Sequence, residues 1–205
     1  MSHKLMLGSL LAVTLVSVGC QPISIGPYRP QRGDIVFQSR PHDPFVEALE
    51  GATLSRYSQC GIVDGKKGNW KVIESYKRVR ETPFKDWIQR GRDARYAVYR
   101  LRDTHQVHVD KMIESAQSYL GRPDDMRYEL DDHKIYSSEL VYKSYKQASG
   151  HELGLLERYG DLNWQPYINL IRELEGGTVP VDRYIISPRS LSKAPQLQKV
   201  FSKGM

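Results

Sequence analysis

The chain has 205 residues, of which 40% are hydrophobic and 26% are charged, and its net charge is +6. This length suits a single domain with a sizeable core. The balance of apolar and charged residues excludes a wholly disordered chain, and no internal repeat is present.

The first residues predict an export signal. His3 and Lys4 give a short basic start, and residues 5–18 are uncharged and mostly apolar. A membrane-spanning helix takes about 20 residues, so this stretch is too short to cross a bilayer. A basic start, a short apolar run and small residues at its end are typical of a secretory signal peptide. The alternative is a buried N-terminal helix.

The end of this segment, Ser17-Val18-Gly19-Cys20, resembles a bacterial lipoprotein cleavage box. The resemblance implies a signal peptide over residues 1–19, a lipidated Cys20 as the mature N-terminus and, because Gln21 follows, sorting to the periplasmic side of the outer membrane. Several acyl chains anchor a protein firmly. The prolines that follow indicate an extended, lipidated tether over residues 20–32. The domain itself is expected over residues 33–205.

Helix and strand signals follow in chain order. They predict strand 33–38, a short helix from Asp43-Pro44, a hairpin of strands 59–63 and 70–74, helix 84–88, strand 96–101, helix 105–120, a helix from Ser137 or Ser138 to Gly150, helix 167–174, strand 179–186 and a helix start at Ser187-Pro188. Strands come first, and helices with a late strand follow. This order predicts an α+β fold with an antiparallel sheet packed against helices.

The excess of positive charge is concentrated in one stretch. Residues 66–102 hold twelve Lys and Arg residues against four Asp and Glu residues. One interpretation is a solvated face, and the other is a surface that meets anionic lipid or cell-wall polymer. Nucleic acid is not an expected partner of an exported protein. With Cys20 lipidated, Cys60 is the only free thiol, so no internal disulfide is expected.

Three blocks lie in order along the chain. The first is residues 33–38 (GDIVFQ) with 52–63 (ATLSRYSQCGIV), the second is 72–74 (VIE), and the third is 119–125 (YLGRPDD) with 136–142 (YSSELVY). Together they resemble the permuted papain-like amidases of the YiiX/YaeF type, within the NlpC-like cysteine hydrolases. The resemblance implies a permuted papain-like fold with an amidase or peptidase site.

In that family a histidine lies on an early strand and a nucleophilic cysteine opens a later helix, whose N-terminal partial charge favours the thiolate. The resemblance places Gln59 at the histidine position and Ser137 at the cysteine position. Glu74 matches a family glutamate near the histidine. Asp124 stands where the family has tyrosine, and Asp124 and Tyr136 are expected to line the pocket.

These residues also have structural explanations. Ser137 is a favoured helix N-cap residue, and the neutral amide of Gln59 cannot act as a general base. Strand alternation places Cys60 on the face opposite Gln59, as a buried core residue rather than a relocated nucleophile. His133 lies in the loop before the helix and is poorly placed to activate the serine. The acidic residues 124–132 lack the spacing of a calcium loop, and no metal or other cofactor is expected.

Three functional hypotheses follow. The first is a catalytically degenerate envelope amidase that keeps a groove between the Ser137 helix and the strands of Gln59 and Glu74, and binds an amide- or acyl-containing ligand there. The second is an active amide or ester hydrolase that uses Ser137. The third is a non-catalytic lipoprotein that tethers the membrane or the cell wall through its basic face.

Overall fold

The computed structural model describes residues 28–205, so the predicted signal peptide, Cys20 and most of the tether lie outside the described residues. Contacts of the folded domain begin at Tyr28. Its ring packs on Phe84 and Phe201, and its hydroxyl donates a hydrogen bond of 2.7 Å to Asp34. Residues 28–32 of the expected tether therefore lie against the domain.

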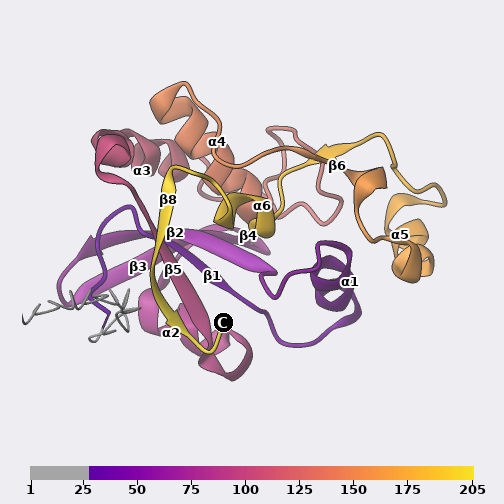
Figure 1. Ribbon diagram of the computed structural model, residues 1–205, viewed down its shortest axis with the longest axis horizontal. Helices are drawn as coiled ribbons and strands as arrows, with labels where there is room; N and C mark the ends of the chain where they lie inside the picture. The colour runs from indigo at the N-terminus through magenta and orange to yellow at the C-terminus, as the bar shows by residue number, and fades with distance from the viewer. Residues whose placement is uncertain (1–27) are drawn as a thin grey trace, which may run out of the picture.

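A six-stranded sheet forms the centre of the domain, in the order β4-β3-β2-β1-β5-β8 (Figure 1). Every neighbouring pair is antiparallel. The strands are β1 (Ile35–Gln38), β2 (Gln59–Lys66), β3 (Asn69–Tyr76), β4 (Arg78–Pro83), β5 (Tyr96–Leu101) and β8 (Leu197–Lys203). The predicted hairpin is confirmed as β2 and β3.

Helices cover both faces of this sheet (Figure 1). Helices α3 (Val109–Ser118) and α4 (Ser137–Ser149) pack on one face, where Met112 and Leu140 join the larger hydrophobic core. Helix α2 (Phe84–Arg90) packs on the other face, where the fully buried Trp87 centres a smaller core. The functional positions of α4 are therefore held on one defined side of the sheet.

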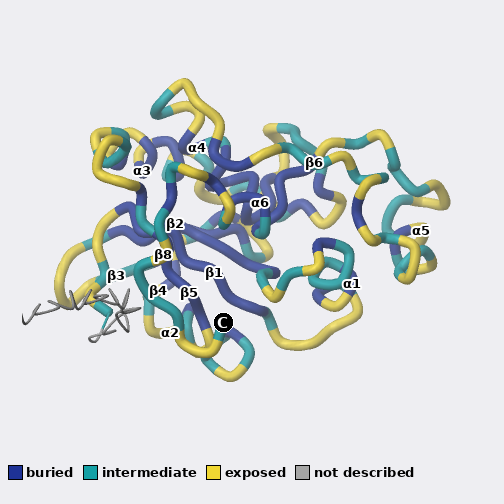
Figure 2. Tube along the Cα trace, viewed as in Figure 1, coloured by how far each residue is buried: buried dark blue, intermediate teal, exposed yellow. Residues whose placement is uncertain are grey.

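A smaller part of the chain lies beside the sheet. It contains helices α1 (Pro44–Ala52) and α5 (Ile168–Glu175) and a two-stranded sheet of β6 (Glu157–Arg158) and β7 (Tyr184–Ile185). An ion pair between Arg183, which precedes β7, and Glu175 at the end of α5 joins these two segments. Helix α6 (Pro188–Ser192) then returns the chain to α4. Figure 2 shows that burial is concentrated in the central sheet and in the segments that α4 contacts.

The α+β class is confirmed, and most predicted elements are present. Three predictions differ from the structure. The predicted helix 105–120 starts as the 3-10 segment Asp103–His108 and becomes α-helical only in α3. The predicted strand 179–186 is reduced to β7, and strands β4 and β8 were not predicted. No helix within residues 28–205 is long and apolar enough to cross a membrane.

Candidate functional site

Helix α4 carries Ser137, the residue that the sequence resemblance assigns to the nucleophile position. The helix begins at Ser137, directly after the N-cap residue Tyr136, and Gly150 ends it in the left-handed conformation, with φ of 75°. The carboxylate of Glu139 accepts the backbone N–H of Tyr136 at 3.2 Å. Ser137 is thus the first residue of the helix and is buried, with 3% of its surface exposed. The interpretation of Ser137 as the N-cap is wrong, because the extended residue that precedes the helix is Tyr136, with ψ of 165°, and Ser137 is already helical.

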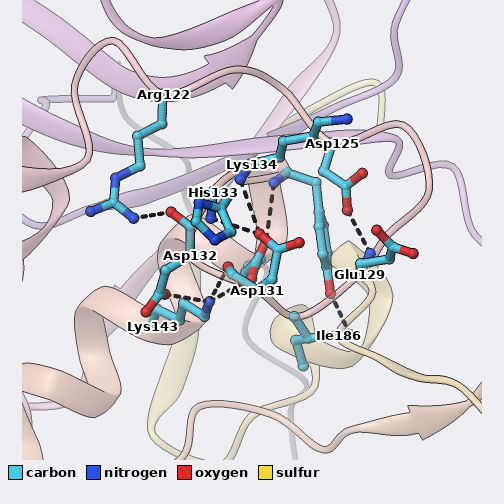
Figure 3. Close-up of polar contacts among 11 residues, drawn as sticks. Arg122, Asp125, Glu129, Asp131, Asp132, His133, Lys134, Lys143 and Ile186 are labelled. Carbon is cyan, nitrogen blue, oxygen red and sulfur yellow. Dashed lines mark hydrogen bonds and ion pairs between the residues drawn. The ribbon is translucent and has the colours of Figure 1, made fainter.

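The first turn of α4 is held by a buried contact between Glu139 and Lys143. Glu139 is fully buried and pairs with Lys143 at 2.8 Å, one turn along the helix. Burial raises the pKa of Glu139 to about 8, although Lys143 and the Tyr136 N–H oppose this shift. Lys143 also pairs with Asp132 at 2.8 Å, as Figure 3 shows. The loop before the helix is therefore tied to its first turn.

Tyr136 completes this end of the helix. Its ring stacks on Tyr128 with 4.2 Å between the ring centroids, and its hydroxyl accepts the backbone N–H of Ile186 at 3.1 Å. The Ser138 hydroxyl donates to the carbonyl of Ile186 at 2.8 Å. The segment that leads into α6 is consequently held against the N-terminus of α4, next to Ser137.

The side chain that contacts Ser137 is Cys60 of β2. The Cys60 thiol lies 3.9 Å from the Ser137 hydroxyl oxygen, and Cys60 is fully buried in the larger core. Burial raises the pKa of the Cys60 thiol far above its ordinary range, and the negative charge of Glu74 adds to the shift, whereas the contact with Ser137 lowers it. The thiol therefore stays protonated and is no thiolate nucleophile. The expectation of a buried core cysteine is confirmed, but its contact with Ser137 was not foreseen.

Gln59 and Glu74 form a separate polar cluster. The amide nitrogen of Gln59 donates to Glu74 at 3.0 Å and to the carbonyl of Ser75 at 2.8 Å. Glu74 is fully buried and also accepts from Thr82 at 2.6 Å and from Arg90. Both N–H groups of the Gln59 amide are thus used, and both oxygens of the carboxylate are occupied.

This cluster lies on the α2 side of the sheet. A Cβ added to Gly61 would lie 2.5 Å from a methyl carbon of Val72 and 3.3 Å from the Cβ of Glu74, so both residues pack over this glycine. Because side chains alternate along a strand, Gln59 shares that face, and Cys60 faces α4. Of the two neighbours in sequence, it is the cysteine that meets the serine.

The expected groove is closed in this structure. Ser137 and Gln59 both border a cavity of only about 10 Å³, too small for a substrate and close to the minimum for one water. Asp124 and Tyr136 are also among its lining residues. Asp124 accepts a hydrogen bond of 2.8 Å from the hydroxyl of Ser75, and burial raises the pKa of its carboxyl group.

The acidic loop before α4 uses its carboxylates internally. Asp125 accepts the backbone N–H groups of Arg127 at 3.0 Å and Glu129 at 2.5 Å. Asp131 accepts those of His133 and Lys134 at 2.6 and 3.0 Å (Figure 3). The His133 side chain is exposed, and the hydrogen bond of this residue runs from its backbone N–H to Asp131. The structure therefore does not bring this histidine to the serine.

Comparison with known proteins places this site in a family. The model of the permuted papain-like amidase enzymes, YaeF/YiiX, C92 family, matches residues 29–201. The chain belongs to this family. YiiX of Escherichia coli K12 is 32% identical to this chain over 177 residues, which cover 84% of this chain and 87% of YiiX. The crystal structure of yiiX from Escherichia coli O157:H7 matches with a TM-score of 0.79 and 30% identity, over 86% of this chain and 99% of that chain.

The yiiX structure is that of a metalloprotein. Within residues 28–205, no group of three His, Cys, Asp or Glu residues is placed to hold a metal ion. In the loop before α4, Asp131 accepts two backbone N–H groups and Asp132 pairs with Lys143. The side chains present here do not fit a bound metal.

Proposed function

We propose that this protein is a catalytically degenerate permuted papain-like amidase, which binds an amide- or acyl-containing envelope ligand without cleaving it efficiently. The hydrogen bonding of Gln59 carries the proposal. The family's histidine position holds a neutral amide whose N–H groups are taken by Glu74 and the Ser75 carbonyl. This amide cannot accept a proton from Ser137.

A serine nucleophile in this place lacks the support that it needs. A serine hydroxyl requires a positioned base, whereas a cysteine can be activated by a lowered pKa alone. Within the described residues, the side chain that hydrogen-bonds Ser137 is Cys60, a buried and protonated thiol. In serine proteases, loss of the nucleophile or its base costs roughly a million-fold in turnover. We therefore expect hydrolysis by this chain to be negligible.

The first experiment compares the native protein with Ser137→Ala. Both are incubated with libraries of peptide amides and acyl esters, and product is followed by mass spectrometry. The two proteins should give the same rate within error. Turnover by the native protein that disappears in Ser137→Ala would overturn the proposal and support the active hydrolase that uses Ser137.

The second experiment restores the family residues. Ser137→Cys is made in a Cys60→Val background, because the two positions are in contact. The variant with Gln59→His added is compared with the matched variant that keeps Gln59. Position 59 borders the same cavity as Ser137, so the alkylation rate against pH should reveal a reactive, low-pKa thiol only when the histidine is present. A reactive thiol in the variant that keeps Gln59 would show that the helix N-terminus alone can lower the thiol pKa. The missing histidine would then not explain the loss of activity.

We also propose that the protein is exported and anchored through a lipid on Cys20, on the periplasmic side of the outer membrane. The cleavage-box resemblance at residues 17–20 supports the anchor, and the charge of residues 66–102 supports contact with anionic lipid or cell-wall polymer. Cys20→Ala should release the protein from membrane fractions. An unmodified mature N-terminus at another residue, found by mass spectrometry, would contradict the anchor.

A further inference from the structure

The fold itself uses half of the positive charge in residues 66–102. Six of the twelve cations there pair with carboxylates, namely Lys71, Arg80, Arg90, Arg92, Arg95 and Arg100. Arg102 donates to the carbonyl of Pro195 at 2.9 Å. The cations that remain are exposed and have no ion-pair partner within residues 28–205, and they are Lys66, Lys67, Lys77, Arg78 and Lys85.

The strand register sorts these exposed cations into two groups. The β2–β3 turn and the start of α2 lie at one end of the sheet, because Lys71, close to that turn, pairs with Pro83, the last residue before α2. The cations at this end are Lys66, Lys67 and Lys85. The β3–β4 turn lies at the opposite end and carries Lys77 and Arg78.

The tether joins the domain beside the first group. The Tyr28 ring lies 6.0 Å from the ring of Phe84, the first residue of α2, and the Tyr28 hydroxyl donates to Asp34. Arg100 holds Asp34 through hydrogen bonds of 2.6 and 2.9 Å, so the attachment is firm. Eight residue steps separate Cys20 from Tyr28 and span at most about 29 Å. A lipid on Cys20 therefore keeps this end of the domain within that distance of the membrane.

The exposed charge at this end is positive around the β2–β3 turn and the start of α2. Arg29 lies exposed beside Tyr28, and we call the group of Arg29, Lys66, Lys67 and Lys85 the tether patch. The exposed acid in these segments is Asp86. The segments before and within α3, at the same end of the sheet, are balanced, with Arg32, Arg102 and Lys111 against Asp103, Asp110 and Glu114. The tether patch is thus the part of this end that an anionic surface attracts.

The family positions lie at the other end of β2. Gln59 begins this strand and Lys66 ends it, so the two residues are about 23 Å apart at the usual rise of a strand. Gln59 borders the small cavity together with Ser137. A domain that turns the tether patch toward the membrane therefore turns the family positions away from it.

We propose that the tether patch rests on anionic phospholipid of the membrane that holds the anchor, with the family positions directed away from that membrane. The proposal rests on the lipid anchor at Cys20 in the proposed function and adds an orientation to it. Phospholipid is favoured over cell-wall polymer because the short tether keeps the patch at a high effective concentration next to the bilayer. A ligand of the family positions then arrives from the aqueous side.

Residue-resolved labelling of lysines tests the orientation. The chain from residue 20 is coupled through the Cys20 thiol to a maleimide lipid, and Cys60 does not compete because it is buried. The vesicles contain either phosphatidylglycerol with phosphatidylcholine or phosphatidylcholine alone. Acetylation of each lysine is followed by peptide mass spectrometry. This coupling replaces lipidation by the cell, so its outcome is independent of whether the native N-terminus carries a lipid.

The tether patch and the far end of the domain should respond differently. Lys66, Lys67 and Lys85 should be acetylated about fivefold more slowly on the anionic vesicles, since a cation close to an anionic bilayer gains about that factor in binding. Lys77, in the β3–β4 turn, and Lys134, in the loop before Ser137, should react equally on both vesicles. Equal protection of the two sets, or protection of neither, would overturn the proposal.

Matched variants separate the tether patch from net charge. One variant combines Lys66→Gln, Lys67→Gln and Lys85→Gln, and the control combines Lys77→Gln, Lys134→Gln and Lys193→Gln, which are exposed elsewhere. In cosedimentation of the uncoupled chain with anionic vesicles, the patch variant should bind about a hundredfold more weakly and the control nearly as the native chain does. Equal weakening of both would overturn the proposal. Tighter binding of the native chain to purified peptidoglycan than to these vesicles, lost in the patch variant, would also overturn it and assign the patch to the polymer.

Discussion

Replacement of Glu139 by glutamine tests how the first turn of α4 is held. Glu139 is fully buried, accepts the N–H of Tyr136 and pairs with Lys143. Burial raises the pKa of Glu139 from an ordinary 4.5 to about 8, because the charged carboxylate would lose its water and the nearby Lys143 ammonium only partly offsets that loss. Glutamine has nearly the same shape and keeps an acceptor for the cap, but it does not titrate. Glu139→Gln therefore removes the titration of this side chain and leaves its shape nearly unchanged.

The sign follows from proton binding. Between pH 4.5 and 8 the folded protein keeps a proton on Glu139 that the unfolded chain has released. Unfolding releases this proton, so the free energy of unfolding decreases by about 1.4 kcal/mol for each pH unit of increase. The stabilisation is complete below pH 4.5 and is lost as the pH rises to 8.

Urea unfolding followed by circular dichroism measures this effect at pH 5, 6, 7 and 8 and constant ionic strength. The native protein should lose about 1.4 kcal/mol per pH unit relative to Glu139→Gln. Other titrating groups are common to both proteins and cancel in the difference. Glu173→Gln, which changes an exposed glutamate of α5, is the matched control and should run parallel to the native protein. Parallel curves for Glu139→Gln would refute the reasoning.

Three further predictions concern the frame around the site. Gly61→Ala should lower the free energy of unfolding by about 1–3 kcal/mol, because the new Cβ would lie 2.5 Å from Val72. In urea unfolding, the double variant Gly61→Ala with Val72→Ala should lose less stability than the sum of the two single variants. Strict additivity would count against this contact. Asp43→Ala should lower the free energy of unfolding by about 1 kcal/mol, because Asp43 accepts the N–H of Val46 at 2.7 Å at the start of α1. Asp43→Asn should retain most of that stability. Equal losses for the two variants would argue against a capping role. Cys60 should resist iodoacetamide up to pH 9 in the folded protein and react only after unfolding, because burial raises the pKa of its thiol; rapid mass-detected labelling of the folded protein would show that the thiol reaches solvent.

Local signals in the sequence were sufficient for much of the fold. Asp43-Pro44 predicted α1 because aspartate at the N-cap and proline in the first turn are both favoured at a helix start. The β2–β3 hairpin was predicted from two apolar strands and a glycine-containing turn. The position of Ser137 at the start of α4 followed from the family resemblance and is confirmed as the first helical residue.

Other features depend on contacts between distant residues. Strand β4 reads as alternating charged and small residues, and only its pairing with β3 defines it. Strand β8 likewise gains its structure from pairing with β5. The contact between Cys60 and Ser137 was missed because strand alternation gives two faces without saying which one meets the helix. Gly61 could have predicted the close packing over β2, since a glycine within a strand indicates that another group approaches the backbone closely.

The place of β8 at the edge of the sheet has a consequence for the order of folding. Strands β1 to β5 are close in sequence and can pair early, but β5 meets β8 only after helices α3 to α6 have been synthesised. Until then the outer edge of β5 presents unpaired backbone groups, which is the kind of edge that recruits other chains. Loss of residues 197–203 should therefore leave a sheet that assembles but aggregates, and a peptide of that sequence supplied in trans should suppress the aggregation.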